Sequence, residues 1–419
     1  MNQTPAAAAP STPARVLMFL GVALAMVGNY YVYDSIGPVA EQLSRLRGFS
    51  DAQIGTLNAV YSLPNIVLVL VGGVLADRFG ARVVIIGTTA LCLVGAAMTA
   101  LDAGFPVMVL GRLLFGIGAE TMIVAIMVAL AQWFGSGWFA LALAANLSFG
   151  RMGSYLADRS PSFAADLYAQ GWQGPLWLAT GFAALSFVAG MAYFMIDRRE
   201  AARGTLALAA RPERIDWGDL LRFRKEYWVI VALCVTFYSV IFPFRSTFAI
   251  KFFQEARGLS LEDAGILNSY VFLAAVFATP VFGWLVDRFG RHADLLVLGA
   301  LPLPLSFLLL EVADHGLWLS TVCLGLSFSL VPAVLWPAVA RYVTPAQLGT
   351  AYGLMTMVQN LGLTVTNVLV GTLNDWSGAG PAHPEGYGPM LVFFGLLGLV
   401  AFVSAVILRG RGRLAPQSA

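Results

Sequence analysis

The feature that most limits how this chain can fold is the number of its apolar segments that are long enough to cross a bilayer. Unpaired backbone groups are too costly in hydrocarbon, so membrane segments of about 20 apolar residues must form helices. The sequence therefore predicts an all-α membrane protein with twelve transmembrane helices. These lie at about 14–43, 54–76, 83–101, 106–133, 139–159, 173–196, 227–253, 262–286, 293–313, 317–342, 347–373 and 389–408.

The composition agrees with a chain that buries much of its surface in lipid. Of its 419 residues, 58% are hydrophobic and 11% are charged, whereas soluble domains carry about 25% charged residues. The formal net charge of +2 excludes a broad electrostatic interaction with nucleic acid, which requires a concentrated basic face. The three cysteines lie singly in apolar segments, so we expect neither a disulfide framework nor a metal site, and no cofactor.

The distribution of basic residues predicts the orientation in the membrane. With the N-terminus in the cytoplasm, cytoplasmic segments hold 17 of the 25 Lys and Arg residues, the opposite side holds five, and the remaining three lie within spans. The positive-inside rule then places both termini in the cytoplasm. The Ala-, Gly- and Arg-rich composition favours the plasma membrane of a bacterium, the inner membrane, with lipid as a partner.

An internal repeat divides the chain in two. The string Gly73–Gly80, GVLADRFG, recurs as Gly283–Gly290, GWLVDRFG, at an offset of 210 residues, and the same offset relates Asn58 to Asn268. Repeats of this kind indicate two similar helical bundles with a solute site between them. We therefore predict a six-helix bundle over 1–196, a cytoplasmic linker over 197–226 and a second six-helix bundle over 227–419.

The repeated string resembles the loop motif between helices two and three of the major facilitator superfamily. This resemblance implies that solute crosses by alternating access, with the binding site open to one side of the membrane at a time. It also implies a gating role for a charged cluster that latches the cytoplasmic side. In this sequence the cluster comprises Asp77, Arg78, Asp287 and Arg288.

Further strings are similar to the lysosomal dipeptide transporter branch of that superfamily. They include Asn29–Asp34, Tyr61–Asn65, Gly111–Glu120, Arg151–Ser154, Leu348–Gly353 and Gln359–Gly362. The resemblance implies dipeptide export by facilitated diffusion, with a Glu and an Arg of helices four and five meeting the charged ends of the peptide. An arginine at position 245 departs from the branch and would suit a more anionic substrate.

Glu120 and Arg151 are the strongest candidates for contact with solute. The predicted turn between spans four and five is 135–137, and both residues lie about 23 Å from it at 1.5 Å per residue. An acid and a base at one depth can bind each other as a structural salt bridge, or the two ends of a zwitterion. A buried ion pair stabilises poorly, which favours the second reading. Arg112 suits either packing or a proton relay.

A second pair of opposite charges lies in spans one and seven. Arg245 minus the repeat offset falls next to Asp34, so we expect these two residues to form an outer gate or to reach the outer headgroups by snorkelling. Arg245 is also a candidate for contact with solute. Three further candidates for the binding site are Tyr30, Tyr31 and Gln359, which lie in the strings of the resemblance.

The sequence predicts a secondary transporter that acts as a monomer and moves a small zwitterionic solute, with dipeptides first, as a uniporter. All three histidines fall in loops or near helix ends, which excludes a His relay at the membrane midplane, and the chain lacks a phosphate-binding loop. It also shows no nucleophile–base set or metal ligands at one depth, so it is not expected to be an enzyme. The alternatives are a carrier of small organic anions and a proton-coupled exporter.

The predicted orientation can be tested with a cysteine placed in the linker 197–226. In intact cells this cysteine should not react with a membrane-impermeant maleimide, whereas it should react after the cells are opened. Labelling from outside intact cells would contradict a cytoplasmic linker and, with it, cytoplasmic termini.

Overall fold

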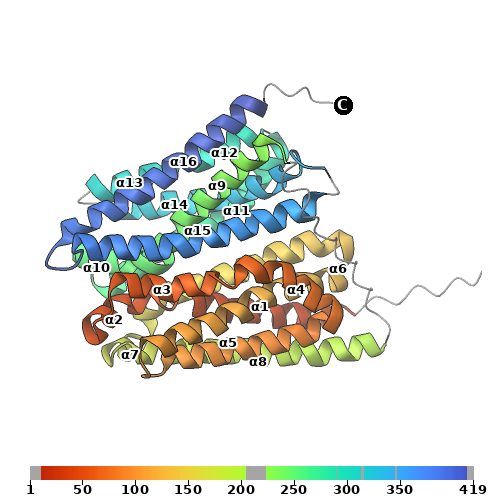
Figure 1. The fold of residues 1–419 in the computed structure, drawn as a ribbon. Coiled ribbons are helices and arrows are strands. Elements are labelled where there is room, and N and C mark those ends of the chain that lie inside the picture. Colours follow the sequence, from red (N-terminus) through yellow and green to blue (C-terminus); the bar gives the residue numbers. More distant parts are fainter. Residues whose placement is uncertain (1–10, 204–222, 290, 313–315, 345–346, 413–419) are drawn as a thin grey trace, which may run out of the picture. The chain divides into compact units, whose positions relative to one another are not determined.

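The computed structural model describes residues 11–203, 223–289, 291–312, 316–344 and 347–412, and Figure 1 shows it as a ribbon. These residues are almost entirely helical. The α-helices are α1 (Thr12–Asp34), α2 (Ala40–Arg47), α3 (Asp51–Ser62), α4 (Asn65–Phe79), α5 (Ala81–Ala100), α6 (Phe105–Phe163), α7 (Ala165–Ala169), α8 (Gln173–Ala202), α9 (Lys225–Pro243), α10 (Ala249–Arg257), α11 (Leu261–Phe289), α12 (His292–Ala300), α13 (Pro302–Val312), α14 (Leu317–Val339), α15 (Leu348–Ser377) and α16 (Gly388–Gly412).

The prediction of membrane-spanning helices is confirmed. Within the described residues, ten helical segments are long and apolar enough to cross a membrane. The two other predicted spans, 54–76 and 139–159, are also helical: they correspond to α3 with α4, and to the second half of α6. Pro64 lies in the short break between α3 and α4, where its missing backbone N–H removes a helical hydrogen bond.

The chain forms two compact units, each described here by itself. Unit 1 comprises Met1–Tyr33, Val67–Leu156 and Leu176–Pro212, and unit 2 comprises Asp34–Ile66, Ala157–Pro175 and Glu213–Ala419. Unit 2 therefore includes two segments from the N-terminal half of the sequence. The division into bundles at 1–196 and 227–419 stays a prediction, and residues 204–222 of the predicted linker lie outside the described residues.

In unit 1, helix α6 consists of two helical arms that meet at Gly135. The backbone of Gly135 has φ 58° and ψ −176°, a conformation that glycine adopts without the steric penalty of a side chain. The predicted turn between spans four and five is therefore present. Buried side chains of α1 and of both arms, among them Met26, Met122 and Ala142, belong to one apolar core.

In unit 2, helix α3 packs closely along α15 (Figure 1). Two glycines make this approach possible. A Cβ atom on Gly55 would lie 2.2 Å from the carbonyl oxygen of Asn367, and one on Gly371 would lie 2.2 Å from that of Asp51. Any larger residue at either position would force the two helices apart.

A second close contact in unit 2 repeats the first at the offset of the internal repeat. Gly265 of α11, which lies 210 residues after Gly55, faces the end of α6, where an added Cβ would lie 2.4 Å from the carbonyl oxygen of Asp158. The two glycines thus join α3 and α11 to segments of the opposite half of the sequence. The repeat provides two equivalent helix contacts as well as the two loop motifs.

We predict that Gly55→Ala and Gly371→Ala weaken the contact between α3 and α15. Overpacking costs about 1–3 kcal/mol, which corresponds to a shift of roughly 5- to 150-fold in a two-state equilibrium. A cysteine in place of Ala59, which is 2% exposed on α3, should then react faster with a maleimide. Gly181→Ala is the matched control because an added Cβ there meets open space; equal rates in all three variants would contradict the prediction.

Candidate solute site and buried charge clusters

Glu120 and Arg151 lie on the two arms of α6 in unit 1. Glu120 precedes Gly135 by about as many residues as Arg151 follows it, so both lie about 23 Å from the turn along their arms. Both side chains are half-buried. A charged side chain within a membrane span is costly and is usually directed to a protein interior or a water-filled cavity. Their partial exposure suits groups that a solute can reach.

The two tyrosine candidates of α1 differ in their surroundings. The ring of Tyr30 lies beside Gly150, where an added Cβ would come within 2.8 Å of it. Tyr30 therefore packs next to the backbone that precedes Arg151, and it is half-buried. Tyr31 is 1% exposed and stacks on Phe182 of α8 with ring centroids 3.8 Å apart. Of the two, Tyr30 is the one placed beside a charged candidate.

Arg112 has a structural role at the end of α1. Its Nη1 and Nη2 atoms donate to the carbonyl oxygens of Val32 and Tyr33, each at 3.0 Å. The last carbonyls of a helix have no intrahelical partners, and a cation is favourable there. The side chain is fully buried. Of the two readings from the sequence, the geometry favours packing over a relay.

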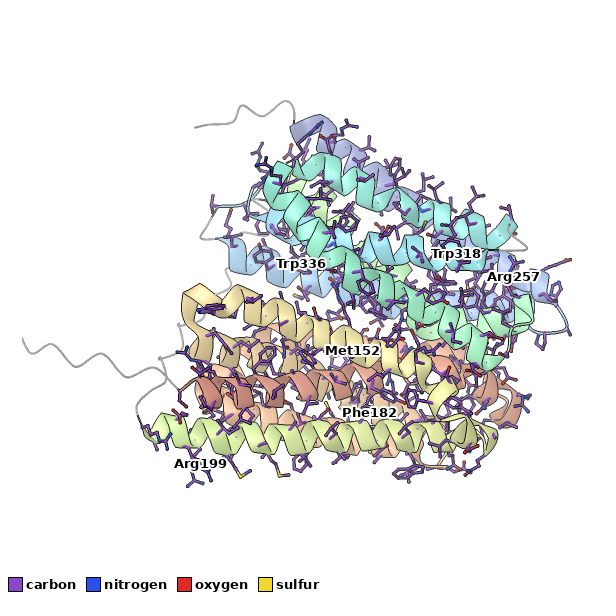
Figure 2. All side chains as sticks on the ribbon, turned by 180° about the vertical axis from the view of Figure 1, so that it is seen from behind. Met152, Phe182, Arg199, Arg257, Trp318 and Trp336 are labelled. Carbon is purple, nitrogen blue, oxygen red and sulfur yellow. The ribbon has the colours of Figure 1, made fainter. Side chains whose placement is uncertain are left out.

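In unit 2, Gln359 of α15 contacts α9, and a separate set of hydrogen bonds joins three aromatic residues. Its Oε1 atom accepts a weak hydrogen bond from the Cys234 thiol at 3.5 Å. Trp336 of α14, labelled in Figure 2, donates from Nε1 to the Tyr238 hydroxyl at 3.0 Å. The hydroxyl of Tyr352 donates to the Trp336 carbonyl at 3.1 Å. The bond from Nε1 orients the tryptophan ring.

The helix that contains Arg245 is interrupted immediately before it. α9 ends at Pro243 and is followed by a π-helical turn, Phe244–Phe248, before α10 begins. The wider turn alters the local hydrogen bonding, and two side chains bind its carbonyls. Asn268 donates to the Arg245 carbonyl at 3.1 Å, and Asn58 donates to the Ser246 carbonyl at 3.2 Å. The two asparagines related by the internal repeat thus both bind carbonyls of this one helix interruption.

Arg245 lies between two carboxylates in the first buried cluster of unit 2. Its Nη1 atom lies 2.5 Å from Oδ1 of Asp34, and its Nη2 atom lies 2.6 Å from Oδ2 of Asp158. Asn268 donates to the other Asp158 oxygen at 3.0 Å. The side chains of Asp34 and Arg245 are each 1% exposed, so neither snorkels to a surface. We call Asp34, Asp158, Arg245 and Asn268 the arginine cluster.

A second buried group, the lysine cluster, lies around Lys251 of α10. Its Nζ atom is 2.6 Å from Oδ1 of Asp51 and 3.1 Å from Oε2 of Glu255. It also donates to the Tyr387 hydroxyl at 3.2 Å, which in turn donates to Glu255. Asn374 donates to the second Asp51 oxygen at 2.8 Å. The cluster ties α3 to α10 and α15.

The N-terminus of α3 is held by a further carboxylate. Asp375 of α15 accepts from the backbone N–H groups of Asp51 at 2.7 Å and Ala52 at 2.9 Å. The first N–H groups of a helix have no intrahelical partners, and an anion is favourable beside them. A capping box between Ser50 and Gln53 binds a further N–H. Helix α3 is therefore anchored to α15 by its end as well as by its side.

The candidates predicted from the sequence do not include four of these buried charges: Asp158, Asp51, Lys251 and Glu255. Lys251 is one of the five basic residues predicted to lie on the side opposite the cytoplasm, although it lies inside the predicted span 227–253 and is only 4% exposed. Its position within an apolar segment was the signal that could have identified it. Asp158 lies at the very end of the predicted span 139–159, where hydropathy does not distinguish a buried acid from one in a headgroup region.

The gating residues of the loop motif lie at the ends of α4 and α11. The side chains of Asp77 and Asp287 lie outside the described residues. Arg78 is exposed and lies over the Phe79 ring, 5.5 Å from its centroid. Arg288 is also exposed. No group of three His, Cys, Asp or Glu side chains in the described part of the chain is placed to hold a metal ion.

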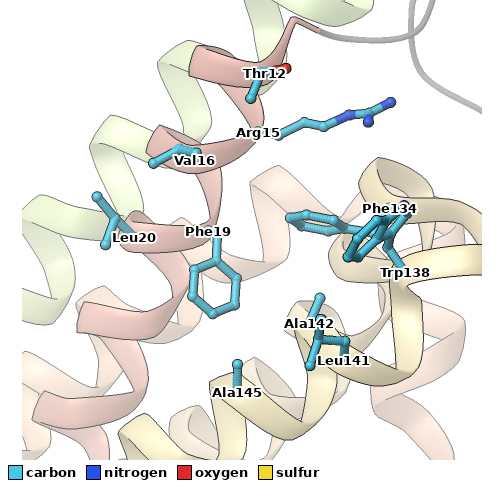
Figure 3. A pocket seen from close by; sticks show the side chains of 10 residues that line it. All are labelled: Thr12, Arg15, Val16, Phe19, Leu20, Phe134, Trp138, Leu141, Ala142 and Ala145. Atoms are coloured by element: carbon cyan, nitrogen blue, oxygen red, sulfur yellow. The ribbon is translucent and has the colours of Figure 1, made fainter.

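A groove of about 330 Å³ in unit 1 lies between the start of α1 and the residues around the α6 turn (Figure 3). Its walls are mostly apolar side chains such as Phe19 and Phe134, and Thr12, Arg15 and the indole of Trp138 supply its polar groups. No carboxylate lines it. The groove is therefore unsuited to an ammonium group and is separate from the candidate site at Glu120 and Arg151.

The apolar spanning helices and the charged side chains within them define a polytopic membrane carrier. The chain belongs to the Major Facilitator Superfamily, whose family model matches residues 18–252 and 244–418. This membership confirms the predicted fold class, twelve transmembrane helices in two bundles, and a carrier rather than an enzyme.

Two relatives and one solved structure illustrate the similarity. The lysosomal dipeptide transporter MFSD1 of Danio rerio is 31% identical over 406 residues, which cover 94% of this chain and 86% of the relative. That of Homo sapiens is 31% identical over 420 residues, which cover 96% and 88%. The structure of a bacterial homolog to the human lysosomal transporter Spinster matches with a TM-score of 0.74 at 15% identity, covering 96% of this chain and 98% of the other.

We predict that Arg245→Gln lowers stability strongly, because it leaves two buried carboxylates without a cation. Removing one partner of a buried ion pair costs about 3–5 kcal/mol. Adding Asp34→Asn and Asp158→Asn to the same chain should recover part of the loss. Melting temperatures in one detergent provide the comparison. Arg45→Gln is the control because its side chain is 61% exposed and exposed pairs contribute about 0–1 kcal/mol; similar losses for Arg45 and Arg245 would contradict the prediction.

Proposed function

We propose that the chain is a uniporter for small zwitterionic solutes, with dipeptides as the first substrate class. The observation that carries this proposal is the position of Glu120 and Arg151, which are both half-buried and about equally far from Gly135 on the two arms of α6. The names of the relatives support it, since they describe dipeptide transporters that align with most of this chain.

The chemistry of the two side chains suits the two ends of a peptide. A carboxylate at Glu120 attracts an ammonium group, and the planar guanidinium of Arg151 binds a carboxylate through two parallel hydrogen bonds. Each solute charge would then replace water with a fixed partner of opposite sign. Tyr30, beside the backbone of Gly150, adds a hydroxyl near Arg151, and Gln359 stays a candidate for a polar contact with the solute. Tyr31, packed on Phe182, would support this wall of the site.

Transport would proceed by alternating access. Unit 2 joins segments 34–66 and 157–175 to residues of the C-terminal half, and both charge clusters lie at this junction. When the carrier opens to the side opposite the termini, these contacts would break. Asp34 and Arg245 therefore act as a gate on that side. Asp77, Arg78, Asp287 and Arg288 act as the latch on the cytoplasmic side.

The carrier is proposed to work as a monomer in the bacterial inner membrane, with both termini cytoplasmic, a six-helix bundle on each side of the linker 197–226, and lipid around it.

A carrier of small organic anions is the second candidate, because Arg245 and Arg151 add positive charge to the spans. Arg245 is engaged by two carboxylates, which makes it less available to an anionic solute. This contact favours the zwitterion.

We predict that Glu120→Gln and Arg151→Lys each weaken dipeptide binding to well-folded protein. The first variant loses the charge that binds the ammonium group, and the second loses the planar fork that meets the carboxylate. Hydrogen bonds to charged groups contribute about 1.5–3 kcal/mol, so the affinity should fall roughly 10- to 150-fold. Calorimetry or thermal shift with a dipeptide library measures the affinity.

Modified ligands and exposed residues supply the controls. An N-acetylated dipeptide should bind wild type poorly and lose little more affinity in Glu120→Gln. Glu262→Gln and Arg199→Lys make the same chemical changes at exposed positions and should leave binding unchanged. Wild-type affinity in both Glu120→Gln and Arg151→Lys would reject the proposed site, and preferential binding of simple carboxylates would favour the anion carrier.

A further inference from the structure

The groove between the start of α1 and the α6 turn has an aromatic wall and an open rim. The Phe19 ring packs edge-on against Phe134, with ring centroids 6.2 Å apart, and against Phe149 at 6.0 Å. The rim is exposed, since Trp138 and Leu141 keep 63% and 62% of their surface accessible. Exposed apolar side chains beside a hollow mark a surface that contacts a membrane or another molecule. On a membrane span, that surface faces lipid.

One end of the groove carries a positive charge. Figure 3 shows Arg15 extending from α1 toward the α6 turn across this end, with Thr12 beside it and Ala145 further along the groove. The Nε atom of Arg15 is buried and has no hydrogen-bond acceptor among the described residues. Thr12 is the first residue of α1, and the N-terminus of a helix is itself favourable for an anion.

From this juxtaposition we infer that the groove binds one phospholipid with an anionic headgroup. Its phosphate lies at Arg15 and the Thr12 hydroxyl, and an acyl chain follows the apolar wall. The order of the two parts is that of a lipid in a bilayer, because Arg15 lies at the end of a span and Leu20 lies about 8 Å deeper along the helix. A guanidinium matches a phosphate through two parallel hydrogen bonds, and each methylene that leaves water adds to the affinity.

Other occupants fit the groove less well. A small soluble anion would use Arg15 but leave the apolar length empty, and an apolar cavity of roughly 150 Å³ already stays dry, less than half of the 330 Å³ here. Residues 1–10 contain no Asp or Glu, so they offer Arg15 no charge. Residues 204–222 contain three acids. This part of the predicted linker is therefore the competing occupant that an experiment has to separate from lipid.

A lipid in this groove would connect α1 with both arms of α6. Phe134 precedes Gly135 and Trp138 follows it, and both line the groove together with residues of α1. A ligand that binds the folded arrangement stabilises it in proportion to its occupancy, so a bound lipid should raise the melting temperature. The site is separate from the one at Glu120 and Arg151, and the inference holds for any solute.

The test adds defined lipids to the delipidated, full-length protein in detergent. Phosphatidylglycerol and phosphatidylcholine with identical acyl chains differ in headgroup charge, and glycerol phosphate supplies an anionic headgroup without chains. Native mass spectrometry gives the dissociation constant of the first bound lipid, and the melting temperature gives a second readout. Wild type should prefer phosphatidylglycerol roughly fivefold for one basic residue at the headgroup. Glycerol phosphate should leave the melting temperature nearly unchanged.

Two matched pairs of variants separate the charge from the groove. Arg15→Gln should weaken phosphatidylglycerol binding roughly tenfold and abolish the preference for it. Lys225→Gln should keep both, because it removes a cation from the exposed start of α9, 210 residues after Arg15. Ala145→Phe fills the groove and should weaken binding of both lipids. Ala144→Phe adds the same ring at the neighbouring exposed position and should not.

Three results would overturn the inference: equal affinity of wild type for the two lipids, a wild-type preference in Arg15→Gln, or wild-type affinity in Ala145→Phe. Replacing Glu213, Asp216 and Asp219 by their amides tests the linker. Unchanged affinity supports the lipid, whereas tighter lipid binding would show that the linker occupies the groove and would also overturn the inference. If Arg15→Gln does not fold, the wild-type comparison and Ala145→Phe still decide the matter. A failure to bind dipeptides would leave these results unaffected, because no solute is present.

Discussion

The contacts of Arg245 depend on an interruption in the helix that carries it. An uninterrupted α-helix binds its own carbonyls, but the π-helical turn after Pro243 presents carbonyls that Asn58 and Asn268 bind instead. The same asparagine, Asn268, then donates to Asp158. One local departure from α-helical geometry thus positions a cation, its acid partner and the segments that carry them. A regular helix would turn the guanidinium to a different face.

The internal repeat explains why two junctions of the same kind exist in unit 2. Gly55 and Gly265 each bring a helix against the backbone of a segment from the opposite half of the sequence, at Asn367 and Asp158 respectively. Glycine contacts set the spacing, and charged clusters set the register. Because buried ion pairs contribute little net stability compared with apolar packing, these clusters give a contact that is specific and can also be broken. Such a contact suits a gate better than a permanent interface.

Much of this arrangement could be predicted from the sequence, and the failures have a common cause. Hydropathy predicts the spans because hydrocarbon leaves the backbone no alternative to helix, and the offset of 210 residues predicts two related halves. The depth of Asp158 could not be read in the same way, since it lies at the end of an apolar segment. Whether such a residue faces water or a buried partner depends on helix packing and on the interruption at 243–248, which involve residues far apart in the chain.

The charged side chains within the spans fall into two groups that differ in their exposure. Arg112, Asp34 and Arg245 are at most 1% exposed, and their partners are fixed parts of the protein. Glu120 and Arg151 are half-buried. A group that binds a solute has to be reached from water before the solute arrives, whereas a gate group can be buried because it has a protein partner in the closed state. Partial exposure allows a solute to enter. The proposed assignment of binding to the half-buried pair and of gating to the buried cluster follows from this difference.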